Sequence, residues 1–249
     1  YTARGKIITP LKDRIGAEVM THYPTDLQLG VEITRQEAWT RREGLEAALT
    51  IPDFIRELVE QIAFEARDDQ RIDKRSGVSQ RMPITVTESV VSNAERRALV
   101  TGEEDLVPRV SDVYAAVPSM TGKMELEYEG EQVGAAKIAR DLIKRAAGEV
   151  FEGYFVGFDF ANTVRWFDAG NNLKLSDDAP ADECVRLLEA VPDLIDNAVV
   201  PFDFKRSDDA MLVSACEFVL EGLYAQNKIS RNEEGGYTAA TKARKDRRG

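Results

Sequence analysis

Apolar residues recur at every third or fourth position over long stretches of the chain, which is the spacing of an amphipathic helix. The clearest stretches predict helices over residues 53–67, 80–100, 132–150 and 208–226. Shorter stretches predict further helices over residues 34–44, 108–118 and 181–190. Helices therefore dominate, and the expected fold class is mainly α.

Two short stretches follow a different pattern, in which polar and apolar residues alternate as they do in a strand. Residues 18–22 predict a strand near the start of the chain, and residues 122–131 predict a short strand or extended segment. The aromatic residues between 151 and 167 lack the repeated lysines and arginines that a nucleic-acid surface needs. We therefore expect these aromatic side chains in the core or at an interface.

The composition is that of a soluble globular protein, with 43% hydrophobic and 31% charged residues in a chain of 249. The formal net charge of −11 does not favour nucleic acid or an anionic membrane surface as a partner. No apolar run approaches the ~20 residues that a membrane helix needs. Cys184 and Cys216 both lie in apolar stretches, so we expect buried free thiols in a reducing compartment such as the cytoplasm.

The residue types present argue against several kinds of chemistry. His22 is the only histidine and there is no Cys-x-x-Cys pair, so no metal ligands are predicted. The acidic pairs along the chain lack the spacing of a calcium-binding loop. A Gly-x-x-x-x-Gly-Lys-Ser/Thr loop is also missing from the sequence, so the chain alone is not expected to cradle the phosphates of a nucleotide.

Two arginines lie near the ends of predicted helices. Arg81 lies in the first turn of a helix for which Ser79 is the expected N-cap, where a cation opposes the helix dipole by about 0.3–1 kcal/mol. Its position alone leaves two interpretations: a side chain that reaches solvent or an acidic neighbour, or part of an anion site with the backbone N–H groups. Arg14 ends a short predicted helix that Gly16 stops, and a cation at that end of a helix is electrostatically ordinary.

Several segments resemble AAA+ ATPases of the magnesium-chelatase-like and MoxR-like branch. Residues 1–24 resemble the segment that follows the sensor-1 strand in this group. Residues 76–84, Ser-Gly-Val-Ser-Gln-Arg-Met-Pro-Ile, resemble its sensor-2 segment. Residues 108–112, 121–131 and 217–224 are similar to a bacterial subgroup described as magnesium-chelatase-like. The resemblance covers most of the chain and is loosest over residues 151–205.

This resemblance implies a role for each of the two arginines. Arg14 matches the arginine finger, which acts in trans on the ATP of a neighbouring subunit. Arg81 matches the sensor-2 arginine, which contacts the γ-phosphate from the same subunit. The implied cofactors are ATP and Mg²⁺, bound mainly by a segment before Tyr1 that would carry the phosphate loop. The implied assembly is a homo-oligomeric ring, usually a hexamer, and the implied partner is a von Willebrand A-type protein.

The resemblance also predicts three parts. Residues 1–30 would be the C-terminal end of an α/β AAA+ core, residues 31–105 a helical lid that carries sensor 2, and residues 106–249 a helical extension with a basic tail. The expected function is that of the C-terminal portion of an ATP-hydrolysing protein-remodelling or chelatase-type motor, inactive without the phosphate loop. The alternatives are a non-catalytic helical protein-interaction module and a fragment of a AAA+ transcriptional regulator. The regulator would need a helix-turn-helix, which residues 208–249 do not convincingly provide.

Overall fold

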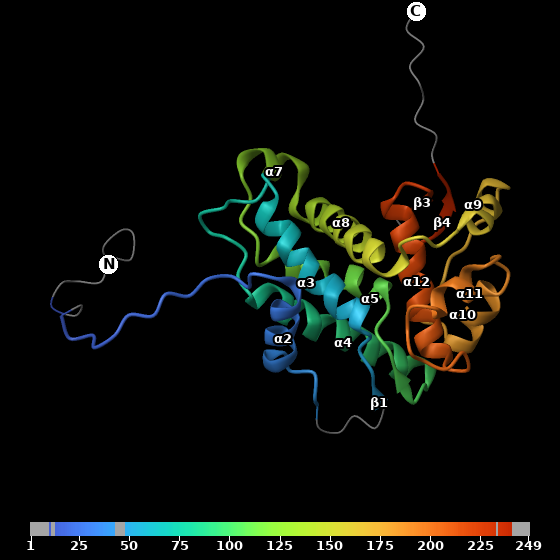
Figure 1. Ribbon diagram of the computed structural model, residues 1–249, viewed down its shortest axis with the longest axis horizontal. Coiled ribbons are helices and arrows are strands. Elements are labelled where there is room, and N and C mark those ends of the chain that lie inside the picture. The colour runs from blue at the N-terminus through green and yellow to red at the C-terminus, as the bar shows by residue number, and fades with distance from the viewer. Residues whose placement is uncertain (1–9, 11–12, 43–47, 233, 241–249) are drawn as a thin grey trace, which may run out of the picture.

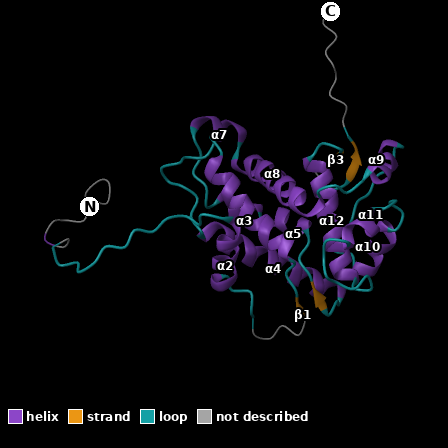
Figure 2. Ribbon diagram, in the orientation of Figure 1, coloured by secondary structure: helices purple, strands orange, loops and turns teal. Residues whose placement is uncertain are grey.

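Helices form most of the protein (Figures 1 and 2). The computed structural model describes residue 10 and residues 13–42, 48–232 and 234–240, and the mainly α class expected from the sequence is confirmed. The helices in chain order are α2 (Leu27–Glu37), α3 (Asp53–Asp68), α4 (Arg81–Thr101), α5 (Val110–Ala115), α6 (Val117–Thr121), α7 (Tyr128–Val133), α8 (Ala135–Phe155), α9 (Ala161–Asp168), α10 (Ala181–Leu188), α11 (Leu194–Val199) and α12 (Asp209–Ala225). The short strands are β1 (Ala48–Leu49), β2 (Asp105–Leu106), β3 (Ile229–Arg231) and β4 (Tyr237–Ala239).

The helices with the clearest hydrophobic pattern are α3, α4, α8 and α12, and the predictions for them are confirmed to within five residues at either end. The largest difference is at the end of α8, which continues to Phe155 because Phe151 and Phe155 extend its buried stripe. The helix expected over residues 108–118 is divided into α5 and α6, and the helix expected over residues 181–190 is α10.

The helix expected at residues 34–44 begins and ends earlier than the sequence suggested. Helix α2 starts after Asp26, whose carboxylate accepts a hydrogen bond from the backbone N–H of Leu29 at 2.9 Å. Aspartate at this position is a strong helix start because it satisfies an otherwise unpaired donor. Gly30, a poor helix former, obscured the pattern at this end of the helix.

The strand expected at residues 18–22 is not formed, since residues 17–24 have neither helix nor strand. A strand needs a neighbour for its backbone hydrogen bonds, and no strand lies beside these residues in the described part of the chain. In the segment 122–131 only Leu126 pairs as a strand residue, in a single antiparallel bridge with Ile72. Helix α7 begins two residues later and takes up the rest of the segment.

Helix α12 is the central helix of the core, and α5, α8, α10 and α11 pack against it (Figure 1). All its residues from Leu212 to Leu223 are buried, as expected of a helix that is apolar on nearly every side. Phe218 of α12 stacks on Phe54 of α3 with ring centroids 4.8 Å apart. Gly222 lets α8 approach closely, because a Cβ there would collide with the ring of Phe151.

The predicted placement of the aromatic residues between 151 and 167 is confirmed. Phe151, Phe155, Phe160 and Phe167 are all buried in the hydrophobic core. Phe151 stacks on Phe155 with ring centroids 4.8 Å apart, and it meets Phe160 at 5.7 Å. These rings join the end of α8 to α9 and α12, so that the last third of the chain packs on the first two.

Two small sheets join parts of the chain that are distant in sequence. Strands β1 and β2 pair in parallel, with Ala48 opposite Asp105. Strands β3 and β4 form an antiparallel hairpin, with Ile229 opposite Ala239. Each sheet is two to three residues long and closes a loop at the edge of the helical body.

The hydrophobic core crosses one of the two boundaries predicted from the resemblance, the one after residue 105. One continuous cluster of buried residues runs from Ile51 to Tyr237. The predicted boundaries after residues 30 and 105 fall inside α2 and β2. The described residues therefore pack across both boundaries, and the division into AAA+ core, lid and extension stays a prediction. The basic tail lies outside the described residues.

Cys184 and Cys216 are both buried and free, as the sequence predicted. Burial raises the pKa of each thiol, so both remain protonated and unreactive at neutral pH. Within the described part of the chain, none of the helices has the length and apolarity needed to cross a membrane.

Candidate functional site

Helix α4 begins without the capping and acidic side chains that are usual in the first turn of a helix. Its N-cap is Gln80 rather than the predicted Ser79, no N-cap side chain accepts a hydrogen bond, and the first turn contains no acidic residue. Arg81 is the first residue of the helix, and its side chain is exposed with no hydrogen bond or ion pair to any described residue. The backbone N–H of Met82 donates to the carbonyl oxygen of Ser79 at 3.0 Å, that of Ile84 donates to the carbonyl oxygen of Gln80 at 3.4 Å, and Pro83 has no N–H. The attraction of this end of α4 for an anion therefore comes from the charge of Arg81 and the positive end of the helix dipole.

The side chain of Gln80 fixes the position of this helix end. Its amide nitrogen donates to the two carboxylate oxygens of Glu60 at 2.8 and 2.9 Å and to the hydroxyl of Thr34 at 3.1 Å. Its amide oxygen accepts a hydrogen bond from Nη2 of Arg67 at 3.1 Å. Thr34 belongs to α2, and Glu60 and Arg67 belong to α3, so Gln80 holds the start of α4 against both helices.

Glu60 is the fully buried member of this group, which we call the Gln80 cluster (Thr34, Glu60, Arg67 and Gln80). Its carboxylate also accepts a hydrogen bond from the Thr34 hydroxyl at 2.9 Å. Burial raises the pKa of Glu60, while the hydrogen bonds from Gln80 and Thr34 and the charge of Arg67 oppose the rise. The cluster therefore satisfies a buried carboxylate with hydrogen bonds from two other segments of the chain, α2 and the start of α4.

Arg67 links the Gln80 cluster to the extended segment before α2. Its Nε donates to the carbonyl oxygen of Val78 at 3.0 Å, and its guanidinium lies 4.7 Å from the ring centroid of Tyr23. Gly77 has a φ of 65°, and a Cβ there would collide with the Tyr23 hydroxyl. Nη1 of Arg67 is buried and has no hydrogen-bond partner among the described residues. The segment that contains His22 and Tyr23 thus contacts the loop that leads to α4.

Arg14, the other arginine singled out by the sequence, lies in an exposed turn of the extended segment before α2. This segment runs away from the helical body, as the blue end of the chain in Figure 1 shows. Arg81, by contrast, lies at the start of α4 within the helical body. The structure therefore does not bring the two predicted site residues together in one chain.

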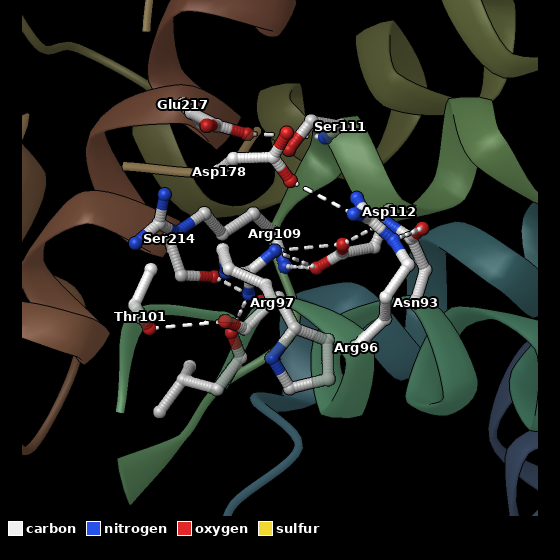
Figure 3. A network of polar contacts seen from close by, with 12 residues as sticks. Asn93, Arg96, Arg97, Thr101, Arg109, Ser111, Asp112, Asp178, Ser214 and Glu217 are labelled. Carbon is white, nitrogen blue, oxygen red and sulfur yellow. Dashed lines mark hydrogen bonds and ion pairs between the residues drawn. The ribbon is translucent and has the colours of Figure 1, made fainter. Parts of the chain in front are cut away.

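A second polar cluster lies in the core beside α4, α5 and α12 (Figure 3). Nη1 of Arg97 donates to the two carboxylate oxygens of Asp112 at 2.7 and 2.9 Å, and its Nη2 donates to the carbonyl oxygen of Val107 at 2.8 Å. Asp112 also accepts hydrogen bonds from the backbone N–H of Arg109 at 2.7 Å and from the side-chain amide of Asn93. The side chains of Arg97 and Asp112 are only 4% and 0% exposed, so this ion pair joins α4 to α5 out of contact with solvent.

Two buried glutamates continue the polar contacts along α12. Glu217 accepts a hydrogen bond from the backbone N–H of Ser111 at 3.1 Å. Glu221 accepts hydrogen bonds from the hydroxyls of Tyr114 at 2.6 Å and Tyr237 at 3.0 Å. Burial raises the pKa of both carboxyl groups, and nearby arginines oppose the rise. These contacts tie α5 and the β3–β4 hairpin to α12, and we interpret them as structural.

The Gln80 cluster was not predicted from the sequence, although two of its members form a pattern that can be recognised there. Glu60 and Arg67 lie seven residues apart, beside the apolar stripe of α3. Residues at that spacing lie on the same side of a helix, so opposite charges there indicate a polar contact at the edge of the core. Glu217 and Glu221 leave a similar signal, because a carboxylate inside an apolar helix needs a buried partner.

Comparison with known proteins found no family model, no curated protein and no solved structure that matches this chain. Among the residues that the structure describes, no group of three or more His, Cys, Asp or Glu is arranged to hold a metal ion. The features of this chain that point to a function are therefore the start of α4 and the resemblance of the surrounding segment.

Proposed function

We propose that this chain is the C-terminal portion of a AAA+ ATPase of the magnesium-chelatase-like branch, in which Arg81 senses the γ-phosphate of ATP. The observation that carries the proposal is that Arg81 is exposed and unpaired at an uncapped helix end with no acidic residue in its first turn. A phosphate group would pair with the guanidinium at the positive end of the helix dipole. ATP and Mg²⁺ would be bound mainly by a phosphate loop that this chain lacks.

The Gln80 cluster supports this role because it positions the residue next to Arg81. Negative charge develops on the γ-phosphoryl oxygens during transfer, and a donor stabilises it best when it is already in place. Gln80 joins the start of α4 to α2 and α3 through part-buried hydrogen bonds, so these helices would move as a unit. A rotation of this unit would carry Arg81 toward or away from the phosphate and couple hydrolysis to movement of the helices.

We propose Arg14 as the arginine finger of the same protein. Its exposed position on a segment that leaves the helical body, with no partner among the described residues, is compatible with contact to another subunit (Figure 1). A residue that acts in trans requires a neighbouring subunit, so the proposal includes a homo-oligomer, which in this family is usually a hexameric ring. The work of the ring would be the remodelling of a partner protein, with a von Willebrand A-type protein as the first to test.

The test of this function is ATP hydrolysis by the complete protein with the substitution Arg81→Ala. We expect turnover to fall by roughly 10³-fold or more, as it does when a transition-state cation is removed from phosphoryl transfer. Arg140→Ala is the matched control, because Arg140 is an exposed arginine of α8 without an ion pair to a described residue. The control should leave turnover unchanged, and circular dichroism should show both variants folded.

Two outcomes would overturn the proposal. One is turnover of the Arg81 variant within about tenfold of the parent protein, which corresponds to only about 1.4 kcal/mol of transition-state stabilisation. The other is hydrolysis by the 249-residue chain alone at a rate typical of the family, since the chain contains no phosphate loop. The alternative, a non-catalytic interaction module, predicts that partner binding by the chain does not depend on Arg81.

A further inference from the structure

A pocket of about 460 Å³ opens where the start of α2 lies beside α3 and α8. Its residues come from all three helices and include Leu27, Glu57, Gln61, Glu149, Val150 and Tyr154. The volume suits a ligand of the size of a long side chain, and the mixture of apolar walls and polar groups is typical of small-ligand sites.

The polar side chains of this pocket offer mainly acceptors. Glu57 and Glu149 contribute carboxylates from α3 and α8, and none of the described residues in the lining is basic. The amide nitrogen of Gln61 donates one of its two N–H groups to Glu65 at 3.1 Å, and its carbonyl oxygen has no hydrogen-bond partner among the described residues. The hydroxyl of Tyr154 is hydrogen-bonded to Glu57, so its oxygen can only accept a further bond.

The negative charge of the pocket is only partly compensated. Glu149 is exposed and has no hydrogen bond or ion pair with a described residue. Glu57 accepts a hydrogen bond from the side-chain amide of Gln28 at 2.9 Å through one of its two oxygens, and this donor is neutral. Asp53 adds a further carboxylate close enough to help raise the pKa of Tyr154. No positively charged donor therefore pairs with the carboxylates of this pocket among the described residues.

We propose that this pocket binds an alkylguanidinium group, such as the side chain of an arginine. A guanidinium carries five N–H donors in one plane and no acceptor, so a single group can join Glu57 to Glu149 and also reach the oxygen of Gln61. Its aliphatic stem would lie against Leu27 and Val150, since long basic side chains commonly cover apolar surface in this way.

The test is an NMR titration of the isotope-labelled 249-residue chain, followed at the backbone amides of Val150 and Gly153, which line the pocket. n-Butylguanidinium should shift both amides saturably with a Kd in the millimolar range, as expected for so small a ligand. n-Butylurea has a similar shape but no charge, and it should bind at least about tenfold more weakly.

N-acetylarginine amide distinguishes two sources of the guanidinium group. Binding at least as tight as that of n-butylguanidinium supports an arginine within a peptide as the natural ligand, because the pocket then admits the flanking backbone. Weaker binding supports a free guanidinium compound. Either result agrees with the proposal, provided that n-butylguanidinium itself binds and n-butylurea does not compete with it.

The substitution Glu149→Gln removes one charge from the pocket without breaking a contact within the protein. It should raise the Kd for n-butylguanidinium about tenfold, while Glu189→Gln should leave it within about twofold. Glu189 is the matched control, because it is exposed at the end of α10 and has no side-chain partner among the described residues. Equal effects of the two substitutions, equal binding of the urea, or a lack of saturable shifts would each overturn the proposal.

Discussion

Removal of the carboxylate of Asp112 would leave three donors without an acceptor. Nη1 of Arg97 and the backbone N–H of Arg109 are buried, and the side-chain amide of Asn93 is part-buried. Water cannot replace the carboxylate easily, since the Asp112 side chain is 0% exposed. Loss of one member of a buried ion pair costs about 3–5 kcal/mol, because the other charge stays buried and unpaired. We therefore expect Asp112→Ala to lower the free energy of unfolding by about 3–5 kcal/mol.

Urea unfolding followed by circular dichroism measures this loss directly. In a chain of this size, each kcal/mol corresponds to about 2–4 °C in Tm, so Asp112→Ala should lower Tm by roughly 6–20 °C. Asp196→Ala is the control, because Asp196 also pairs with an arginine, Arg206, but with side chains that are 68% and 64% exposed. That substitution should cost less than about 1 kcal/mol.

A double-substitution cycle separates the ion pair from the general cost of an altered core. Arg97→Met combined with Asp112→Ala should cost less than the sum of the two single changes, by about 2–3 kcal/mol, because no charge is left unpaired. The reasoning is refuted if the costs of the single changes add to within about 0.5 kcal/mol. It is equally refuted if Asp112→Ala costs no more than Asp196→Ala.

Three further predictions follow from contacts elsewhere in the protein. Gly222→Ala should destabilise the protein by about 1–3 kcal/mol because its Cβ would collide with Phe151. Gly153→Ala in α8 has open space around its Cβ and should stabilise the protein by about 0.5–1 kcal/mol. A Tm that shifts in the same direction for both variants would contradict this. Gln80→Leu should cost about 1–3 kcal/mol in urea unfolding by depriving Glu60 of two hydrogen bonds, and a cost near zero would mean that the Gln80 cluster does not hold α4. Hydrogen bonds from Arg71 lower the pKa of Asp69 from 3.8 to about 2, so the ionised carboxylate stabilises the fold by about 2 kcal/mol above about pH 4, and this contribution is lost as the pH falls toward 2. The difference in unfolding free energy between Asp69→Asn and the parent protein should therefore shrink between pH 5 and pH 3. A difference that stays constant over this range would contradict the assignment.

Local patterning was sufficient to predict the long helices. In α3 the apolar residues at helical spacing are the ones that the structure buries, and α12 was recognisable because apolar residues occupy most of its positions. The start of α2 could not be found in the same way, because it depends on the N-cap Asp26 and its first residues include Gly30. The strand expected at residues 18–22 failed because alternation alone cannot supply a partner strand.

The candidate site was only partly predictable for a related reason. Arg81 stood out because an arginine in the first turn of a helix opposes the helix dipole, and the structure leaves it exposed at that position. Its neighbour Gln80 is positioned by contacts with Glu60, which lies 20 positions away in the sequence, and with Thr34, which lies 46 positions away. Contacts at such distances depend on how three helices pack, which no local pattern encodes.

The most direct test of the role of Arg81 is a structure of the complete protein bound to Mg²⁺ and a non-hydrolysable ATP analogue. We expect the Arg81 guanidinium to donate to an oxygen of the γ-phosphate at about 2.7–2.9 Å, with Gln80 still hydrogen-bonded to Glu60. A γ-phosphate without any contact to Arg81, whose side chain remains in solvent as it is here, would contradict the proposed function.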